Sequence, residues 1–116
     1  MIMVRETGEA PISRTGSGNI VHWLVGTEDG PVNFEMRKVV IPVGGSSSKG
    51  SHAHEHVVYV LSGSGSIYGD DGSQRLYPGV SVFVPGGEVH QWINEDPQLA
   101  LEFLCIIPAG CEDFIK

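Results

Sequence analysis

The stretch GVSVFVPGGEVHQWIN, from Gly79 to Asn94, carries the most informative pattern in the chain. It begins with a short apolar run, Val80–Pro85, passes through two glycines, and continues into a second apolar run that starts at His90. Two apolar runs separated by Pro and Gly are typical of β-strands joined by a turn. The pattern therefore predicts a strand pair with a histidine at the start of its second strand.

Runs of the same kind recur along the whole chain. Each is bounded by Gly, Pro, Asp or Ser residues, which favour turns, and no convincing amphipathic helix is predicted before the last few residues. The predicted strands are Ile20–Val25, Phe34–Pro42, His56–Gly63, Ser66–Gly69, Val80–Pro85, His90–Ile93 and Ala100–Pro108. Many short strands at regular spacing predict an all-β sandwich or small barrel.

Local features refine this prediction. The segment GDDGS predicts a hairpin whose turn is centred on Asp71-Gly72. Two runs, His56–Leu61 and Val80–Val84, are apolar at almost every position. Because such runs are typical of strands covered on both sides, we expect both to be buried on both faces.

Three of the five histidines lie in one pentapeptide, at His52, His54 and His56. Imidazole is a common ligand for divalent transition metals. Residues four apart on a straight strand lie about 13 Å apart, so His52 and His56 can share an ion only if the chain bends near Ala53–Glu55. His90 is the candidate for a further ligand. The alternative interpretation is a solvated loop, and the spacing alone does not decide between the two.

Length and charge exclude several classes of function. The chain has 116 residues, enough for one domain with a single core. A net charge of −7 without a basic cluster argues against nucleic-acid binding. The two cysteines are expected to be free thiols in a reducing compartment. Since no apolar run is long enough for a membrane span or a secretory leader, we expect a cytoplasmic protein without membrane contact.

The chain resembles the cupin family, in particular small single-domain bacterial cupins of the manganese type. The resemblance rests first on Gly79, Pro85, Gly87, His90 and Asn94, which have the spacing of the second cupin motif. It runs from about Asn33 to Pro108.

The first cupin motif is similar to GSHAHEHVVYVLSGSG. There His56 stands where many cupins carry a glutamate, and His52 matches the second histidine of the paired His-x-His. The first histidine of that pair would fall on Gly50, so one expected ligand is missing.

The resemblance implies an antiparallel jelly-roll β-barrel that holds one divalent metal. Mn or Fe is expected first, with Ni, Zn, Co and Cu as alternatives. It also implies a homodimer. We expect residues 1–30 to form an N-terminal arm, Met1–Ser13, and a first strand, which the dimer could exchange, and residues 31–116 to form the barrel.

Three arrangements of the metal site remain open. In the first, His52, His56 and His90 hold the ion alone and water fills the other positions, as catalytic metals require. In the second, His54 replaces the ligand missing at Gly50. In the third, the barrel is a metal-free binding module. We favour them in that order.

Several other residues are candidates for the site. Arg37 is a candidate catalytic residue, because an inward arginine can orient a carboxylate or phenolate with two hydrogen bonds. The resemblance suggests that Phe103 and Cys105 face the metal cavity. Cys105 has no base placed to make it a nucleophile, and oxidation beside a redox metal is its more plausible chemistry. Tyr59 and Trp92 are candidates for the wall of a substrate pocket.

The remaining candidates have structural interpretations. His22 is isolated in an apolar run and is interpreted as structural, and Trp23 as a core residue or a dimer contact. Glu55 is either an acceptor that fixes a histidine tautomer or a solvated residue. Cys111 is expected to be exposed.

The sequence points to a metal-dependent enzyme that acts on a small organic molecule, with a dioxygenase-type oxidoreductase as the first hypothesis. A non-catalytic protein that binds or senses a small molecule is the competing hypothesis. A third is a Lewis-acid isomerase or lyase acting on a sugar or keto acid. Uptake of dioxygen separates the first hypothesis from the other two.

Overall fold

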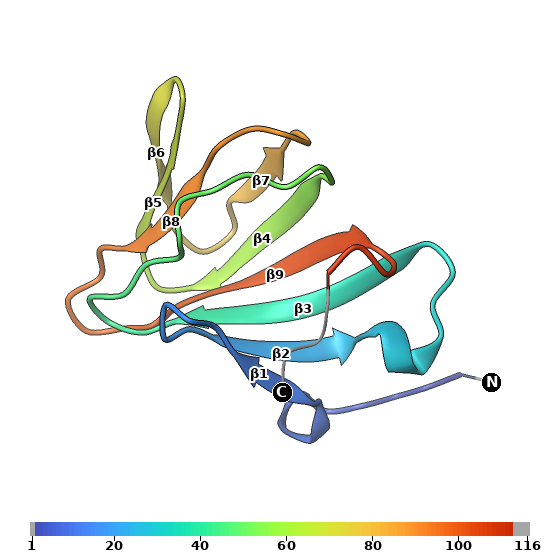
Figure 1. The fold of residues 1–116 in the computed structure, drawn as a ribbon. Helices are drawn as coiled ribbons and strands as arrows, with labels where there is room; N and C mark the ends of the chain where they lie inside the picture. Colours follow the sequence, from blue (N-terminus) through green and yellow to red (C-terminus); the bar gives the residue numbers. More distant parts are fainter. Residues whose placement is uncertain (1, 113–116) are drawn as a thin grey trace.

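A computed structural model describes residues 2–112 of the chain. Met1 of the predicted arm and the last four residues of the predicted barrel domain lie outside the described residues. The described chain forms nine strands and two short 3₁₀ turns, with no α-helix (Figure 1). The elements are η1 (Thr7–Glu9), β1 (Ile12–Arg14), β2 (Ile20–Val25), η2 (Thr27–Asp29), β3 (Phe34–Ile41), β4 (His56–Ser62), β5 (Gly65–Gly69), β6 (Gly72–Leu76), β7 (Ser81–Val84), β8 (Gln91–Asn94) and β9 (Leu101–Pro108).

The strands form two antiparallel sheets. The larger has the order β1-β2-β3-β9-β4-β7 and the smaller the order β6-β5-β8. Figure 1 shows the small sheet above one end of the large one, with strands distant in sequence, β3, β9 and β4, side by side. The predicted single-domain, all-β jelly-roll fold is confirmed.

The core lies between the two sheets. Trp92 of β8 stacks on Phe103 of β9 with 4.7 Å between ring centroids, so the two sheets meet through an aromatic pair. The other buried members of this cluster are aliphatic or sulfur-containing side chains: Ile41, Val58, Val60, Leu76, Val84, Leu101, Cys105 and Ile107.

The prediction that two strands are buried on both faces is wrong. Along β4, Val58 and Val60 point into the core, whereas Val57 and Tyr59 are each 49% exposed. On β7, Phe83 is 58% exposed. These strands belong to an antiparallel sheet, which covers its core on one face only, so an apolar side chain at every position does not mean burial of both faces.

The predicted hairpin is confirmed, but its turn is one residue earlier than expected. Gly69 pairs with Gly72, which leaves Asp70 and Asp71 as the two turn residues. At the N-terminus, β1 pairs with β2 of the same chain. Exchange of this strand between two copies stays a prediction, as does the homodimer.

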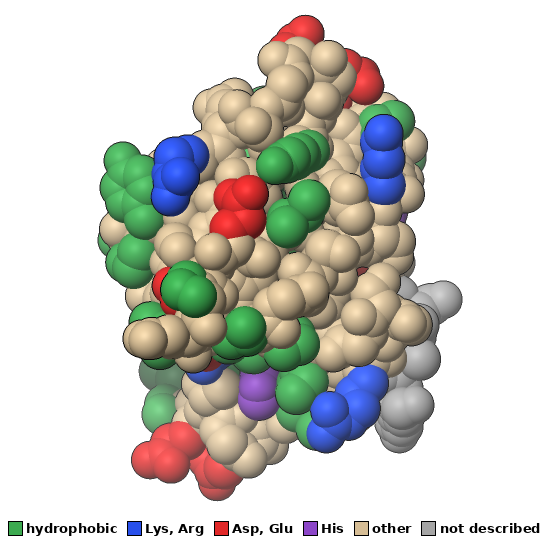
Figure 2. Space-filling model, turned by 90° about the vertical axis from the view of Figure 1, so that its left-hand side faces the viewer, with side chains coloured by type: hydrophobic (Ala, Val, Ile, Leu, Met, Phe, Trp, Pro, Cys, Tyr) green, Lys and Arg blue, Asp and Glu red, His purple; other side chains and the backbone are tan. Residues whose placement is uncertain are grey.

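On the face shown in Figure 2, acidic, basic and apolar side chains are interspersed, and no basic patch gathers. The expected absence of nucleic-acid binding stays a prediction. Within residues 2–112, no helix has the length and apolar character that crossing a membrane requires.

Candidate metal centre

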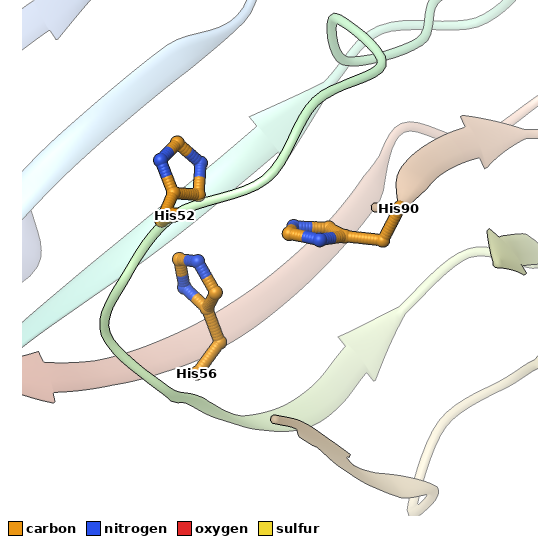
Figure 3. A group of neighbouring side chains, drawn as sticks. All are labelled: His52, His56 and His90. Atoms are coloured by element: carbon orange, nitrogen blue, oxygen red, sulfur yellow. The ribbon is translucent and has the colours of Figure 1, made fainter. Parts of the chain in front are cut away.

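Three histidine side chains point toward one another, of which His56 and His90 are buried and His52 is exposed (Figure 3). One ring nitrogen from each of His52, His56 and His90 lies within 4.8 Å of the other two. His56 opens β4, His90 directly precedes β8, and His52 lies in the loop before β4. The chain bends at residues 53–54, as predicted, and brings the rings of His52 and His56 to 5.1 Å between centroids.

The two glycines of the PGG turn hold the loop that carries His52. The backbone N–H of Gly87 donates to the carbonyl oxygen of His52 at 2.6 Å. A side chain at Gly86 would place its Cβ 2.4 Å from the carbonyl oxygen of Ala53, and Gly87 has a φ of +85°. Both positions therefore require glycine, one for close approach and one for its backbone conformation.

The hydrogen bond of His90 aims a lone pair of its ring into the site, and His56 has one ring nitrogen without a partner among the described residues. The Nδ1 of His90 lies 2.9 Å from the carbonyl oxygen of Glu88, which accepts only if Nδ1 carries the proton and leaves Nε2 as the ligand atom. In His56, Nδ1 lies 3.5 Å from Cys105 Sγ. Its Nε2 is buried and has no hydrogen-bond partner among the described residues.

Burial favours the neutral form of two of these imidazoles, His56 and His52. It lowers the pKa of His56 to about 3, with a smaller contribution from the positive charge of Arg37. Burial is also the main cause of the lowered pKa of His52. Neutral imidazoles with an unpartnered buried nitrogen suit a divalent transition metal, so the residues present fit the metal that the sequence predicts.

His54 lies beside this group but has a different partner. Its Nε2 lies 2.6 Å from Oε2 of Glu112. His52, His54 and Glu112 form a second group whose candidate ligand atoms lie within 4.8 Å of one another. A role for His54 as a fourth ligand to the three-histidine group therefore stays a prediction.

Sequence reasoning missed Glu112. It lies in the turn after β9, where an acidic residue fits no motif. The turn reaches the site because buried Glu35 of β3 accepts a hydrogen bond from the N–H of Gly110 at 2.6 Å. Glu35 is the one acidic residue of β3, and it gave no sign in the sequence of its contact with this turn.

The histidines open onto a cavity of about 210 Å³. Arg37, Trp92, Phe103 and Cys105 are among the residues that line it. Its other walls are mostly aliphatic or small polar side chains: Thr15, Asn19, Val21, Val39, Ile41, Ser47 and Ser48. The assignment of Tyr59 to the pocket wall is wrong. Because His56 and Val58 face inward, alternation along β4 directs Tyr59 to the outer face.

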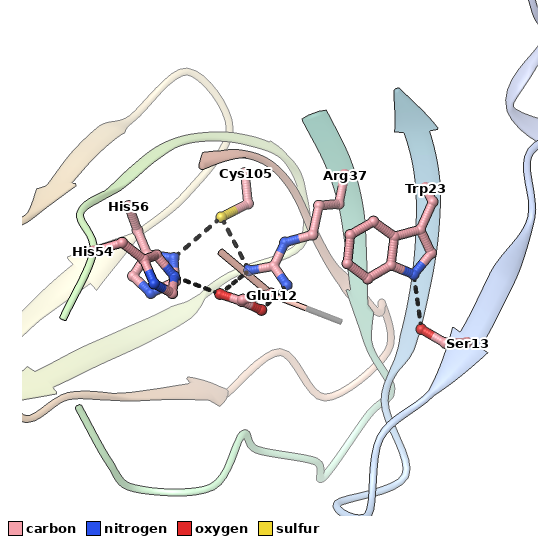
Figure 4. Close-up of polar contacts among 7 residues, drawn as sticks. All are labelled: Ser13, Trp23, Arg37, His54, His56, Cys105 and Glu112. Atoms are coloured by element: carbon pink, nitrogen blue, oxygen red, sulfur yellow. Dashed lines mark hydrogen bonds and ion pairs between the residues drawn. The ribbon is translucent and has the colours of Figure 1, made fainter. Parts of the chain in front are cut away.

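Arg37 and Cys105 lie deep in this cavity. Arg37 Nη2 lies 3.5 Å from Cys105 Sγ, and the guanidinium also pairs with the carboxylate of Glu112 (Figure 4). Burial raises the pKa of the Cys105 thiol, although Arg37 opposes it. Cys105 therefore remains a neutral thiol and a poor nucleophile.

The remaining residues singled out in the sequence lie outside the group of three histidines. Trp23 is buried and donates its indole N–H to Ser13 Oγ at 2.9 Å, which confirms the core assignment. His22 belongs to neither group of candidate ligands among the described residues. Glu55 and Cys111 are both exposed.

The comparisons with known proteins agree with this geometry. The family model of the cupin domain matches residues 37–107. No curated protein sequence matches the chain. Among solved structures, the polyketide cyclase RemF from Streptomyces resistomycificus is 25% identical with a TM-score of 0.84, over 97% of this chain and 81% of that one.

Two further structures carry the family name. A cupin 2 conserved barrel domain protein from Rhodopseudomonas palustris is 27% identical over 95% of this chain and 71% of that one, with a TM-score of 0.73. A cupin 2 domain-containing protein from Halorhodospira halophila is 30% identical over 87% of this chain and 71% of that one, with a TM-score of 0.77. The family match covers more than half of the chain and includes all three converging histidines, and the chain therefore belongs to the cupin family.

Proposed function

We propose that this protein is a metal-dependent enzyme that acts on a small organic molecule inside the barrel. The convergence of His52, His56 and His90 on a cavity of about 210 Å³ is the observation that carries the proposal. Three protein ligands leave coordination positions open to substrate or water, as catalysis at a metal requires. We propose Mn or Fe as the resident ion.

Each part of the chain has a task in this proposal. His52, His56 and His90 would hold the ion, which when bound supplies Lewis acidity or, for Mn and Fe, redox chemistry with dioxygen. Trp92 and Phe103 pack against an apolar substrate and exclude water from it. Arg37 orients a polar group of the substrate from the cavity wall.

The proposed reaction is a dioxygenase-type oxidation of an apolar, aromatic or alkenyl substrate. The mostly apolar walls suit such a compound. A second candidate is a Lewis-acid reaction without dioxygen, such as a cyclisation, isomerisation or elimination on a keto compound. The likeness to a polyketide cyclase favours it, as does a ligand set of three imidazoles without a carboxylate, which leaves the positive charge of the ion undiminished.

Elemental analysis of untagged protein, followed by assays in air and under nitrogen, tests the proposal. We expect about one transition-metal ion per chain and metal-dependent turnover of a compound in a panel of aromatic acids, alkenes and keto acids. Turnover that stops under nitrogen indicates the oxygenase, and unchanged turnover indicates the Lewis-acid enzyme. A protein that stays metal-free after reconstitution contradicts the proposal and favours a module that only binds its ligand.

A further inference from the structure

The side chain of Arg37 is placed as a binding group rather than as a structural support. It extends from β3 into the cavity and its side chain is only 11% exposed. Its guanidinium carbon lies 5.7 Å from the ring centroid of Trp23, which covers one side of it (Figure 4). Its Nε is buried and has no hydrogen-bond partner among the described residues. The guanidinium thus keeps an unused donor beside the cavity.

Glu112 supplies the negative charge opposite Arg37. Its two carboxylate oxygens face Nη1 and Nη2, in the paired geometry that a guanidinium offers to a carboxylate. Burial alone would raise the pKa of Glu112, but Arg37 and His54 outweigh it and hold that pKa below its usual range. Glu112 is therefore ionised at neutral pH.

Among the described residues that line the cavity, these two are the only formally charged ones, histidines aside. A buried guanidinium without a counter-charge is strongly unfavourable. A molecule that takes the place of Glu112 must therefore bring a negative charge of its own, and a carboxylate fits the same two nitrogens.

The position of this pair connects it to the histidine group. Cys105 Sγ lies 3.5 Å from Arg37 Nη2 and 3.5 Å from His56 Nδ1, so one sulfur atom separates the guanidinium from a proposed metal ligand. A carboxylate held by Arg37 would leave the rest of a small molecule next to the three histidines.

Glu112 is also placed so that it can leave. Its side chain is 21% exposed, and its turn is held by two hydrogen bonds that do not involve that side chain: from the N–H of Gly110 to Glu35 and from the N–H of Cys111 to the carbonyl oxygen of Pro108. Rotation of the Glu112 side chain frees Arg37 and His54 without breaking the pairing of β9 or either of these hydrogen bonds.

We propose that Arg37 forms a carboxylate subsite for the substrate, and that Glu112 of the chain's own C-terminal turn occupies this subsite until a substrate carboxylate displaces it. The inference rests on the proposed function, since it assigns a substrate class, small organic acids, to the same cavity. Glu112 thereby acts as an internal competitor that screens out neutral molecules.

Calorimetric titration of the full chain with benzoate tests the proposal, with neutral benzamide as the isosteric control. Metal is first removed with EDTA, so that the carboxylate cannot bind an ion and the result does not depend on the metal or on turnover. We expect Glu112→Gln to bind benzoate at least tenfold more tightly than wild type, and benzamide to gain much less. Arg37→Gln, alone or combined with Glu112→Gln, should bind no benzoate.

Glu102→Gln is the matched control variant. Like Glu112, Glu102 is a partly exposed glutamate that forms an ion pair with a basic residue of β3, in this case Lys38 at 2.6 Å. Neither Glu102 nor Lys38 lines the cavity. Its substitution should leave benzoate binding unchanged.

Unchanged or weaker benzoate binding by Glu112→Gln would overturn the proposal, as would benzoate binding that survives the loss of Arg37. An equal gain for benzamide would also overturn it, because Glu112 would then merely fill space. Elemental analysis and turnover assays test the metal-dependent function separately. The proposed function and the carboxylate subsite can therefore fail independently of each other. Circular dichroism spectra that match wild type establish that Glu112→Gln, a substitution near the chain's end, is folded.

Discussion

Gly50 and His90 face each other in an antiparallel bridge: the N–H of Gly50 donates to the carbonyl oxygen of His90 at 3.1 Å, and the N–H of His90 donates back at 2.9 Å. Gly50 is the position at which the cupin pattern places its first histidine. It lines the same cavity as the three histidines, and a Cβ added to it would meet no atom within 4 Å. The backbone position of the missing ligand therefore lies at the cavity with space for a side chain, but the residue there is glycine.

Gly50→His should restore a fourth imidazole to this place. Because one more nitrogen can then bind the ion, we expect metal affinity to rise by about tenfold or more. Any catalytic turnover should fall, since an open coordination position is lost. Competition with a chromophoric chelator measures the affinity. Gly50→Ala adds a Cβ without a ligand and should bind metal as wild type does; equal affinities of the histidine and alanine variants would contradict the prediction.

Alanine substitutions of the individual histidines should divide them into two groups. Loss of His52, His56 or His90 should lower the metal content of the purified protein from about one ion per chain to a small fraction. His54→Ala should retain the ion, because the Nε2 of His54 is engaged by Glu112. Elemental analysis of the four variants, purified in parallel without a tag, provides the measurement. Loss of metal in His54→Ala would instead assign His54 the role of the ligand missing at Gly50.

The three histidines could be predicted from the sequence, but not from spacing alone. Spacing showed only that His52 and His56 can share an ion if the chain bends between them, and the resemblance to the two cupin motifs joined His90 to them. Glu112 could not be predicted, because it belongs to no motif and reaches the cavity through a long-range contact of its turn with Glu35.

The placement of Tyr59 failed for a different physical reason. In an apolar run, composition alone does not reveal which alternate residues face the core. The inward direction of β4 is set by His56, whose ring must point into the barrel to reach the other histidines. Because side chains alternate along a strand, an inward His56 places Tyr59, three residues later, on the outer face of the sheet. The inward direction of His56 would therefore have been enough to correct the assignment of Tyr59 to the pocket wall.

Glu35 should contribute strongly to stability, because its buried carboxylate ties two separate turns to β3. It accepts hydrogen bonds from Thr27 Oγ1 at 2.8 Å and from the N–H of Gly110 at 2.6 Å. Glu35→Ala leaves both donors without this acceptor and opens a cavity, so we expect a loss of about 2–4 kcal/mol in the free energy of unfolding. Thr27→Ala removes one donor and should cost about 1 kcal/mol. Urea unfolding measures both, and equal losses for the two variants would contradict the assigned role.

The stability of the metal-free protein should depend on pH through His56. Burial lowers the pKa of His56 from 6.5 to about 3 in the folded protein. Between these two values the unfolded chain binds a proton at His56 that the folded chain does not. The free energy of unfolding should therefore fall as the pH is lowered from about 6.5, by up to about 1.4 kcal/mol per pH unit from this group, and His56 should have no effect above that range.

Urea unfolding in EDTA, at several pH values between about 5 and 7, measures this dependence. The interval lies above the range in which the carboxylates with lowered pKa values, Glu112 and Asp29, take up protons. His56→Gln removes the titrating group and should flatten the pH profile, while the lowered pKa of His52 leaves a smaller slope. Saturating metal should raise the free energy of unfolding without flattening the wild-type profile, because the ion binds only the neutral rings of the folded state while the unfolded chain still takes up protons. Parallel profiles for wild type and His56→Gln without metal would show that His56 is solvated and readily protonated, which would contradict its buried position.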